Sequence, residues 1–121
     1  QFCIDNNIKN GKISGIGAVT NTEIGAFDII NKRYLKKEFS SVLELVSFEG
    51  NITLKDNKPF LHAHVVLSNH DMNTFGGHLF ETTIAVVGEF FIRKFEGNGY
   101  REINEDIGLP CICLENNFAA K

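Results

Sequence analysis

The feature that most constrains the fold is a polar cluster, Asp56–Pro59, between two runs of strand-forming residues. The run NITLKD occupies 51–56, and the run FLHAHVVLS occupies 60–68. A cluster of Asp, Asn and Pro between runs rich in β-branched and aromatic residues predicts a hairpin turn. The chain is therefore expected to contain antiparallel strands that pair with their neighbours in sequence.

Further β-like runs flank this hairpin, and few helical signals accompany them. They are GKISGIGAV (11–19), EIGAFDI (23–29), SVLELVSFEG (41–50), HLFETTIAVVGEFFIRKF (78–95, expected in two pieces after the turn NHDMN) and LPCICL (109–114). In the run 41–50, Leu43 and Leu45 share the more apolar face, and the alternation blurs at Phe48. The pattern predicts an α+β chain that is mostly antiparallel β-sheet, with few flanking helices.

One helical segment is expected at the start of the chain. Residues 1–11, QFCIDNNIKNG, are typical of the last turns of a helix that ends at Asn10 and Gly11. A chain of 121 residues with 43% hydrophobic residues suits a single packed domain, 1–121. Its apolar runs are shorter than the roughly 20 residues of a membrane helix, so no membrane partner is expected.

The charge balance argues against DNA as the main partner. The net charge is −3, whereas binding to a phosphate backbone calls for clustered Lys and Arg. The one basic cluster, NKRYLKKEF at 31–39, is interpreted as a solvated loop or strand end. DNA binding is expected to be weak or absent.

The three cysteines show no disulfide framework. Cys3, Cys111 and Cys113 make an odd count, which fits a reducing cytoplasm. On a strand, the sulfur atoms of Cys111 and Cys113 share one face, and small buried hydrophobic residues are the favoured interpretation.

The histidines are the strongest functional signal, because all four lie between Leu61 and His78. Alternation along a strand puts His62 and His64 on one face, and a return strand after Gly76 and Gly77 would bring His78 to the same face. Three neutral imidazoles with an open fourth position are typical of a zinc site that binds water or a ligand. His70, in the polar turn, is expected to be a surface residue.

Two alternatives stay open for this group. The histidines could be hydrogen-bonded polar residues on a half-buried sheet face. If they hold zinc, Glu81 or Asp28 are weak candidates for a general base, and nothing in the sequence shows a substrate pocket.

Several of these segments together resemble the plant and prokaryote conserved (PPC) domain, in its stand-alone bacterial or archaeal form. The similarity covers roughly residues 2–115, and its most specific parts are PFLHAHVVLS and FGGHL. The resemblance implies an antiparallel sheet flanked by helices, a homotrimer, and metal binding by residues that match His62, His64 and His78. Family members are often labelled predicted DNA-binding proteins. The family normally has a strand and most of a helix before the position of Gln1, and these are expected to be missing here.

Three functions follow as hypotheses. The first is a zinc-binding homotrimeric module with an assembly or regulatory role and a small ligand at the open metal position. The second is a small zinc-dependent enzyme that uses a metal-bound water. The third is a DNA-binding regulatory protein, which the net charge disfavours.

Overall fold

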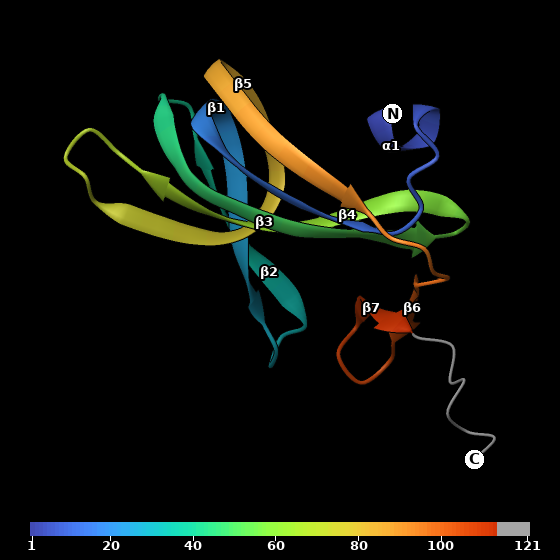
Figure 1. Cartoon of the computed structure of the whole chain (residues 1–121). Helices are drawn as coiled ribbons and strands as arrows, with labels where there is room; N and C mark the ends of the chain where they lie inside the picture. The colour runs from blue at the N-terminus through green and yellow to red at the C-terminus, as the bar shows by residue number, and fades with distance from the viewer. Residues whose placement is uncertain (114–121) are drawn as a thin grey trace.

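The hairpin predicted at Asp56–Pro59 is present and organises the sheet. A computed structural model describes residues 1–113 of the chain. Its elements in chain order are α1 (Phe2–Asp5), β1 (Gly11–Asp28), β2 (Arg33–Phe39), β3 (Leu43–Lys55), β4 (Lys58–Ser68), β5 (Thr74–Lys94), β6 (Tyr100–Asn104) and β7 (Leu109–Cys113) (Figure 1). Asp56 and Asn57 form the turn between β3 and β4 with φ values of 50° and 61°. These positive values are those of the tight turn that matches the twist of paired strands.

The architecture is mostly antiparallel β-sheet with little helix, as predicted, and it is closer to all-β than the α+β label implies. Within residues 1–113 the single helix has four residues. It ends at Asp5, with Asn6 as its C-cap, rather than at Asn10 and Gly11, because Asn7 takes a left-handed conformation with φ of 52°. Asparagine tolerates that conformation better than most residues, and Gly11 instead begins β1.

Three strands are longer than their sequence runs suggested. The runs 11–19 and 23–29 belong to one strand of 18 residues, and β5 is one strand of 21 residues instead of two pieces. The runs 41–50 and 51–56 likewise merge into β3. The last predicted run is present as β7, and its final residue, Leu114, lies outside the described residues.

A bulge explains the blurred alternation in β3. The pairing of β3 with β4 shifts register between Leu45 and Ser47, so Val46 is an extra residue in the ladder. Because one inserted residue exchanges the two faces of a strand, Phe48 is buried on the same side as Leu43 and Leu45.

The strands β1, β5, β4 and β3 pair in a closed order. β1 pairs with β5 along one edge and with β3 along the other, while β4 joins β3 to β5. Figure 1 shows these strands bending strongly around one another, with β2 and the β6–β7 hairpin attached beyond them.

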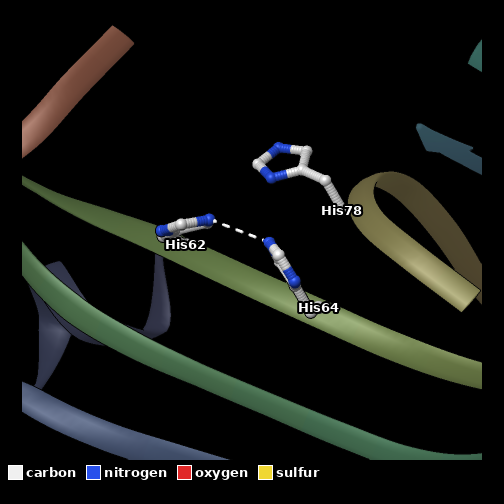
Figure 2. Close-up of side chains that lie close together, drawn as sticks. All are labelled: His62, His64 and His78. Atoms are coloured by element: carbon white, nitrogen blue, oxygen red, sulfur yellow. Dashed lines mark hydrogen bonds between the residues drawn. The ribbon is translucent and has the colours of Figure 1, made fainter. Parts of the chain in front are cut away.

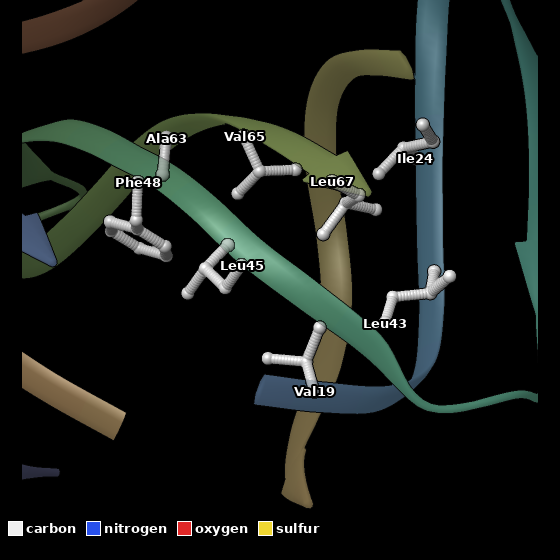
Figure 3. Packing of buried hydrophobic residues seen from close by; sticks show 8 residues of the cluster. All are labelled: Val19, Ile24, Leu43, Leu45, Phe48, Ala63, Val65 and Leu67. Carbon is white, nitrogen blue, oxygen red and sulfur yellow. The ribbon is translucent and has the colours of Figure 1, made fainter. Parts of the chain in front are cut away.

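The core fills the inside of this closed arrangement. Eight buried apolar side chains meet there (Figure 3): Val19, Ile24, Leu43, Leu45, Phe48, Ala63, Val65 and Leu67. Because β4 alternates, its histidines point to the opposite side of the strand from this core.

Candidate metal centre

Strand alternation places two of the predicted ligands outside the core. Ala63 and Val65 of β4 are 4% and 3% exposed, and His62 and His64 lie on the other face of the same strand. His62 is half-buried and His64 is exposed. The packing of Ala63 and Val65 in the core thus fixes the β4 backbone from which His62 and His64 project.

The third histidine comes from the adjacent strand. His78 of β5 lies directly opposite His64 in the antiparallel ladder. Side chains at opposite positions of such a ladder lie on the same face of the sheet. The β4–β5 hairpin therefore delivers His78 to the face that carries His62 and His64.

Two glycines allow β5 to come this close. A Cβ atom at Gly76 would lie 2.3 Å from the carbonyl oxygen of Val65, and one at Gly77 would lie 2.6 Å from that of Gly25. Both distances are far shorter than van der Waals contact. Side chains at these positions would push β5 away from β4 or β1, and His78 with it.

The three rings converge (Figure 2). The Nε2 atoms of His62 and His64 are 3.2 Å apart. The ring centroid of His78 lies 5.1 Å from that of His62 and 5.6 Å from that of His64. One ligand nitrogen of each residue lies within 4.8 Å of the others, and the group includes no carboxylate or thiol among residues 1–113.

Two aromatic rings pack against His78. The ring of Tyr34 lies 4.8 Å from the His78 ring, and the ring of Phe80 lies 4.6 Å from it. Tyr34 belongs to β2, the edge strand that covers 33–39 of the basic segment 31–39. The Lys and Arg side chains of this segment are exposed, and Tyr34 is the residue that reaches His78. Burial raises the pKa of Tyr34, which keeps its hydroxyl protonated beside the histidine.

The surroundings keep His62 and His78 neutral. Burial, followed by the neighbouring His62, His64 and Lys36, lowers the pKa of His78 to about 4. Burial is also the main cause of the lowered pKa of His62, with Arg101 and His64 contributing. Since a metal binds the neutral imidazole, both residues are prepared as ligands at neutral pH.

One buried nitrogen atom indicates that the three histidines suit a metal ion. Nδ1 of His78 is buried and has no hydrogen-bond partner among the described residues. Buried polar atoms normally have a partner, because leaving one unpaired costs about 1–3 kcal/mol. The interpretation as hydrogen-bonded polar residues accounts for the contact between His62 and His64 but leaves His78 incompletely satisfied.

A hollow of about 530 Å³ opens beside His62 and His64. Its lining combines charged, amide and small residues: Gly11, Lys12, Glu49, Gly50, Asn51, His62, His64 and Phe95. Glu49 lies opposite His64 and Asn51 lies opposite His62 in the β3–β4 ladder. Both side chains therefore share the face of the histidines.

The remaining predicted site residues are not at the centre. Glu81 lies in a separate depression with Thr22 and Glu38. Asp28 accepts hydrogen bonds from the side chain of Asn31 and from the backbone N–H groups of Asn31 and Ile30, which lower its pKa and fix the turn after β1. His70 is exposed in a turn, as predicted.

The cysteines also lie outside the metal-binding group. Cys3, Cys111 and Cys113 are free and half-buried. Cys111 and Cys113 lie two positions apart on β7 with the exposed Ile112 between them, in agreement with their expected shared face. They are less buried than the sequence interpretation proposed.

Sequence reasoning missed Glu49, Asn51 and Tyr34, although the first two had a readable signal. The two-residue turn fixes Lys55 opposite Lys58, so equal steps along both strands pair Glu49 with His64 and Asn51 with His62. Tyr34 had no such signal, because β2 reaches His78 only through its pairing with β1.

Comparison with known proteins supplies the family. Residues 1–96 match the Plants and Prokaryotes Conserved (PCC) domain. The chain belongs to this family. No curated protein matched the chain.

Solved structures of the PCC domain and its relatives share this fold. A plant- and prokaryote-conserved protein from Pyrococcus horikoshii is 36% identical with a TM-score of 0.87, over 94% of this chain and 80% of that chain. The metal-containing protein AF0104 from Archaeoglobus fulgidus is 39% identical with a TM-score of 0.85, over 91% and 78%. A candidate DNA-binding protein from Bacteroides thetaiotaomicron is 29% identical with a TM-score of 0.89, over 93% and 79%.

The described part of the chain offers no helix with the length and apolar character needed to cross a membrane.

Proposed function

We propose that this PCC domain is a zinc-binding module that assembles as a homotrimer and serves an assembly or regulatory role. Zinc would be held by His62, His64 and His78, with a small ligand at the fourth position. The single observation that carries the proposal is the convergence of three imidazoles, one with a buried Nδ1 atom that has no hydrogen-bond partner among the described residues. The metal-containing protein from Archaeoglobus fulgidus is a similar chain and supports the assignment.

Zinc suits this donor set best. Three imidazoles without thiolate or carboxylate form a common set for zinc with one open position. Two nitrogens bound at about 2.0–2.1 Å to a tetrahedral ion lie roughly 3.3 Å apart, by geometry from these bond lengths. The Nε2 atoms of His62 and His64, at 3.2 Å, already have that separation.

The homotrimer is supported by apolar side chains on the outer surface of the sheet. On β5, Val86 is 76% exposed and Phe91 is 81% exposed, and Ile16 of the adjacent β1 is 57% exposed. Exposed apolar residues that gather on neighbouring strands mark an association surface. A second copy of the same chain would cover them in the proposed assembly.

The cysteines support a reducing compartment, and we propose the cytoplasm. All three thiols are free in the structure, including the neighbouring pair Cys111 and Cys113. Free thiols persist where glutathione keeps them reduced.

A small zinc-dependent enzyme is the second candidate, and Glu49 is the observation that favours it. Zinc at this site would supply a Lewis acid that lowers the pKa of a bound water to near 7. Glu49, opposite His64 and at the hollow, is better placed to accept a proton than Glu81 or Asp28. Its pairing with Lys12 at 3.5 Å is solvent-exposed, so the carboxylate can leave that partner at little cost.

Elemental analysis tests the proposed function. Protein purified without a histidine tag and supplied with zinc should carry about one zinc per chain, since strong sites fill stoichiometrically. The double variant His62→Ala/His64→Ala should lose this metal, and His70→Ala should keep it because His70 lies in an exposed turn. Wild-type protein that takes up no zinc, or a double variant that retains it, rejects the proposal.

A further inference from the structure

We infer that the ligand at this site is a small organic carboxylate, and that Asn51 is its second point of attachment. The inference rests on the metal site proposed above. It names the class of molecule that this site takes, and it starts from a buried arginine that the metal ligands do not use.

Arg101 of β6 lies on the face of the sheet that carries the histidines. Its side chain is 7% exposed, and its Nε atom donates to Thr53 Oγ1 at 2.8 Å. Its Nη2 atom donates to Asn51 Oδ1, and its Nη1 atom donates to the carbonyl oxygen of Pro110 at 3.1 Å. Since Asn51 lies opposite His62, the guanidinium is anchored beside the site.

Arg101 decides which end of the Asn51 amide faces the ligand. A guanidinium has only donors, so the atom of Asn51 that it contacts is the oxygen. The amide nitrogen, Nδ2, is left as a donor with no protein acceptor among residues 1–113, and Asn51 lines the hollow with His62 and His64. The ligand that meets Asn51 must therefore offer an acceptor.

The charges around the site call for a negative ligand. The acceptors that hold Arg101 are all neutral, so its charge is not balanced by a carboxylate within the described chain. Glu49, which lines the hollow, pairs with Lys12 at 3.5 Å, and Glu23 pairs with Lys36 at 3.3 Å. A divalent ion on three neutral imidazoles adds further positive charge to a half-buried region, where screening by water is reduced.

A carboxylate provides both the hydrogen-bond acceptor that Asn51 requires and the negative charge that the site requires. One of its oxygens can bind the metal while the other accepts from Nδ2 of Asn51. Residues at opposite positions of a ladder have Cβ atoms about 5 Å apart, so a group bound at His62 lies within reach of Asn51. The organic part of the molecule would extend along the hollow past Gly50 and Phe95.

The test uses protein loaded with cobalt(II), whose visible spectrum responds to its ligands. Acetate is titrated at constant ionic strength, and acetamide serves as the neutral probe of the same shape. We expect acetate to shift the cobalt spectrum in a saturable manner and acetamide to leave it unchanged. A spectrum that acetate does not alter, in protein that has bound cobalt, overturns the inference and leaves the metal site standing.

Variants of Asn51 and Arg101 distinguish the loss of a ligand contact from a general disturbance of the structure. Asn51→Asp removes the donor but keeps the size and can pair with Arg101, so cobalt uptake should persist while the acetate dissociation constant rises about tenfold or more. Asn57→Asp, the same change in the exposed β3–β4 turn, should match the wild type. Arg101→Lys, a change in a positioning residue, should weaken acetate without altering the acetate-free cobalt spectrum.

Two outcomes besides an unchanged spectrum would count against the inference. Acetate binding of wild-type strength in both Asn51→Asp and Asn51→Ala overturns it, and using both variants covers a folding failure of either. Failure of the wild type to bind cobalt at all overturns the proposed metal site and this inference together.

Discussion

His64 and His78 lie opposite each other on adjacent antiparallel strands, with ring centroids 5.6 Å apart. Because they pair directly in the β4–β5 ladder, their separation is set by backbone pairing rather than by loops. His62 joins them through the alternation of β4. The site is thus as rigid as the sheet, and perturbing the pairing should perturb metal binding.

Lowering the pH should destabilise the metal-free protein through His78. Its pKa is about 4 in the folded chain, and a histidine in an unfolded chain titrates near 6.5. Between these values the unfolded chain binds more protons, so the free energy of unfolding falls as the pH drops from about 6.5 toward about 4. Urea unfolding of chelator-treated protein across this window measures the decline.

The variant His78→Gln should show a smaller decline, because the residue with the lowered pKa is gone. His70→Gln, a change in an exposed turn, should keep the wild-type decline. An undiminished pH dependence in His78→Gln would show that other groups cause the effect.

A methyl group at Gly77 should disrupt the metal site without altering any of the three ligands. The new Cβ atom of Gly77→Ala would meet the Gly25 carbonyl oxygen at 2.6 Å, which forces β5 away from β1 and moves His78. We expect a loss of about 1–3 kcal/mol in the free energy of unfolding and weaker zinc binding. Thr74→Ala, at an exposed position of the same strand, is the control. Normal zinc affinity in Gly77→Ala would mean that strand spacing does not set the site.

The hairpin at the site could be predicted from local sequence, because its turn and alternation are local properties. Asp56 and Asn57 indicate the turn, and the same turn fixes Asn51 opposite His62. The face of Phe48 could not be predicted, since the bulge at Val46 is defined only by pairing with β4. Local rules therefore located the histidines but not the whole strand pattern.

The other parts of the site depend on contacts distant in sequence. Arg101 reaches Thr53 and Asn51 only because β6 pairs in parallel with β3, and β6 was not predicted from its short, charged sequence. Tyr34 reaches His78 because β2 extends the sheet beside β1. Neither pairing has a periodic or turn signal that one sequence reveals.

An acidic substitution on the exposed face of β5 should prevent assembly. Phe91 is 81% exposed in the single chain, and in the proposed homotrimer Phe91→Glu would bury a charge at the contact. Light scattering should give about 40 kDa for the wild type, three times the 13.5 kDa chain, and a monomer for the variant. Ile30→Glu, in the exposed turn after β1, should remain trimeric. A wild-type monomer at micromolar concentration would refute the assembly.

Binding to DNA should be weak, independent of sequence and sensitive to salt. The chain has a net charge of −3, and alternation puts Lys36 and Lys37 of β2 on opposite faces. Lys36 is also engaged by Glu23 and lies 4.0 Å from the centre of the Phe80 ring. Titration of a fluorescent duplex at two salt concentrations measures this. Sub-micromolar, sequence-selective binding at about 150 mM salt would put the DNA-binding function first.

X-ray absorption at the zinc edge tests the central claim most directly, because it reports the atoms bound to the metal. Tag-free protein loaded with one equivalent of zinc should show three imidazole nitrogens at about 2.0–2.1 Å and one further light atom. The signal of ordered imidazoles should disappear in His62→Ala/His64→Ala. A sulfur shell at about 2.3 Å, which would indicate the cysteines, or fewer than three imidazoles in the wild type would contradict the account.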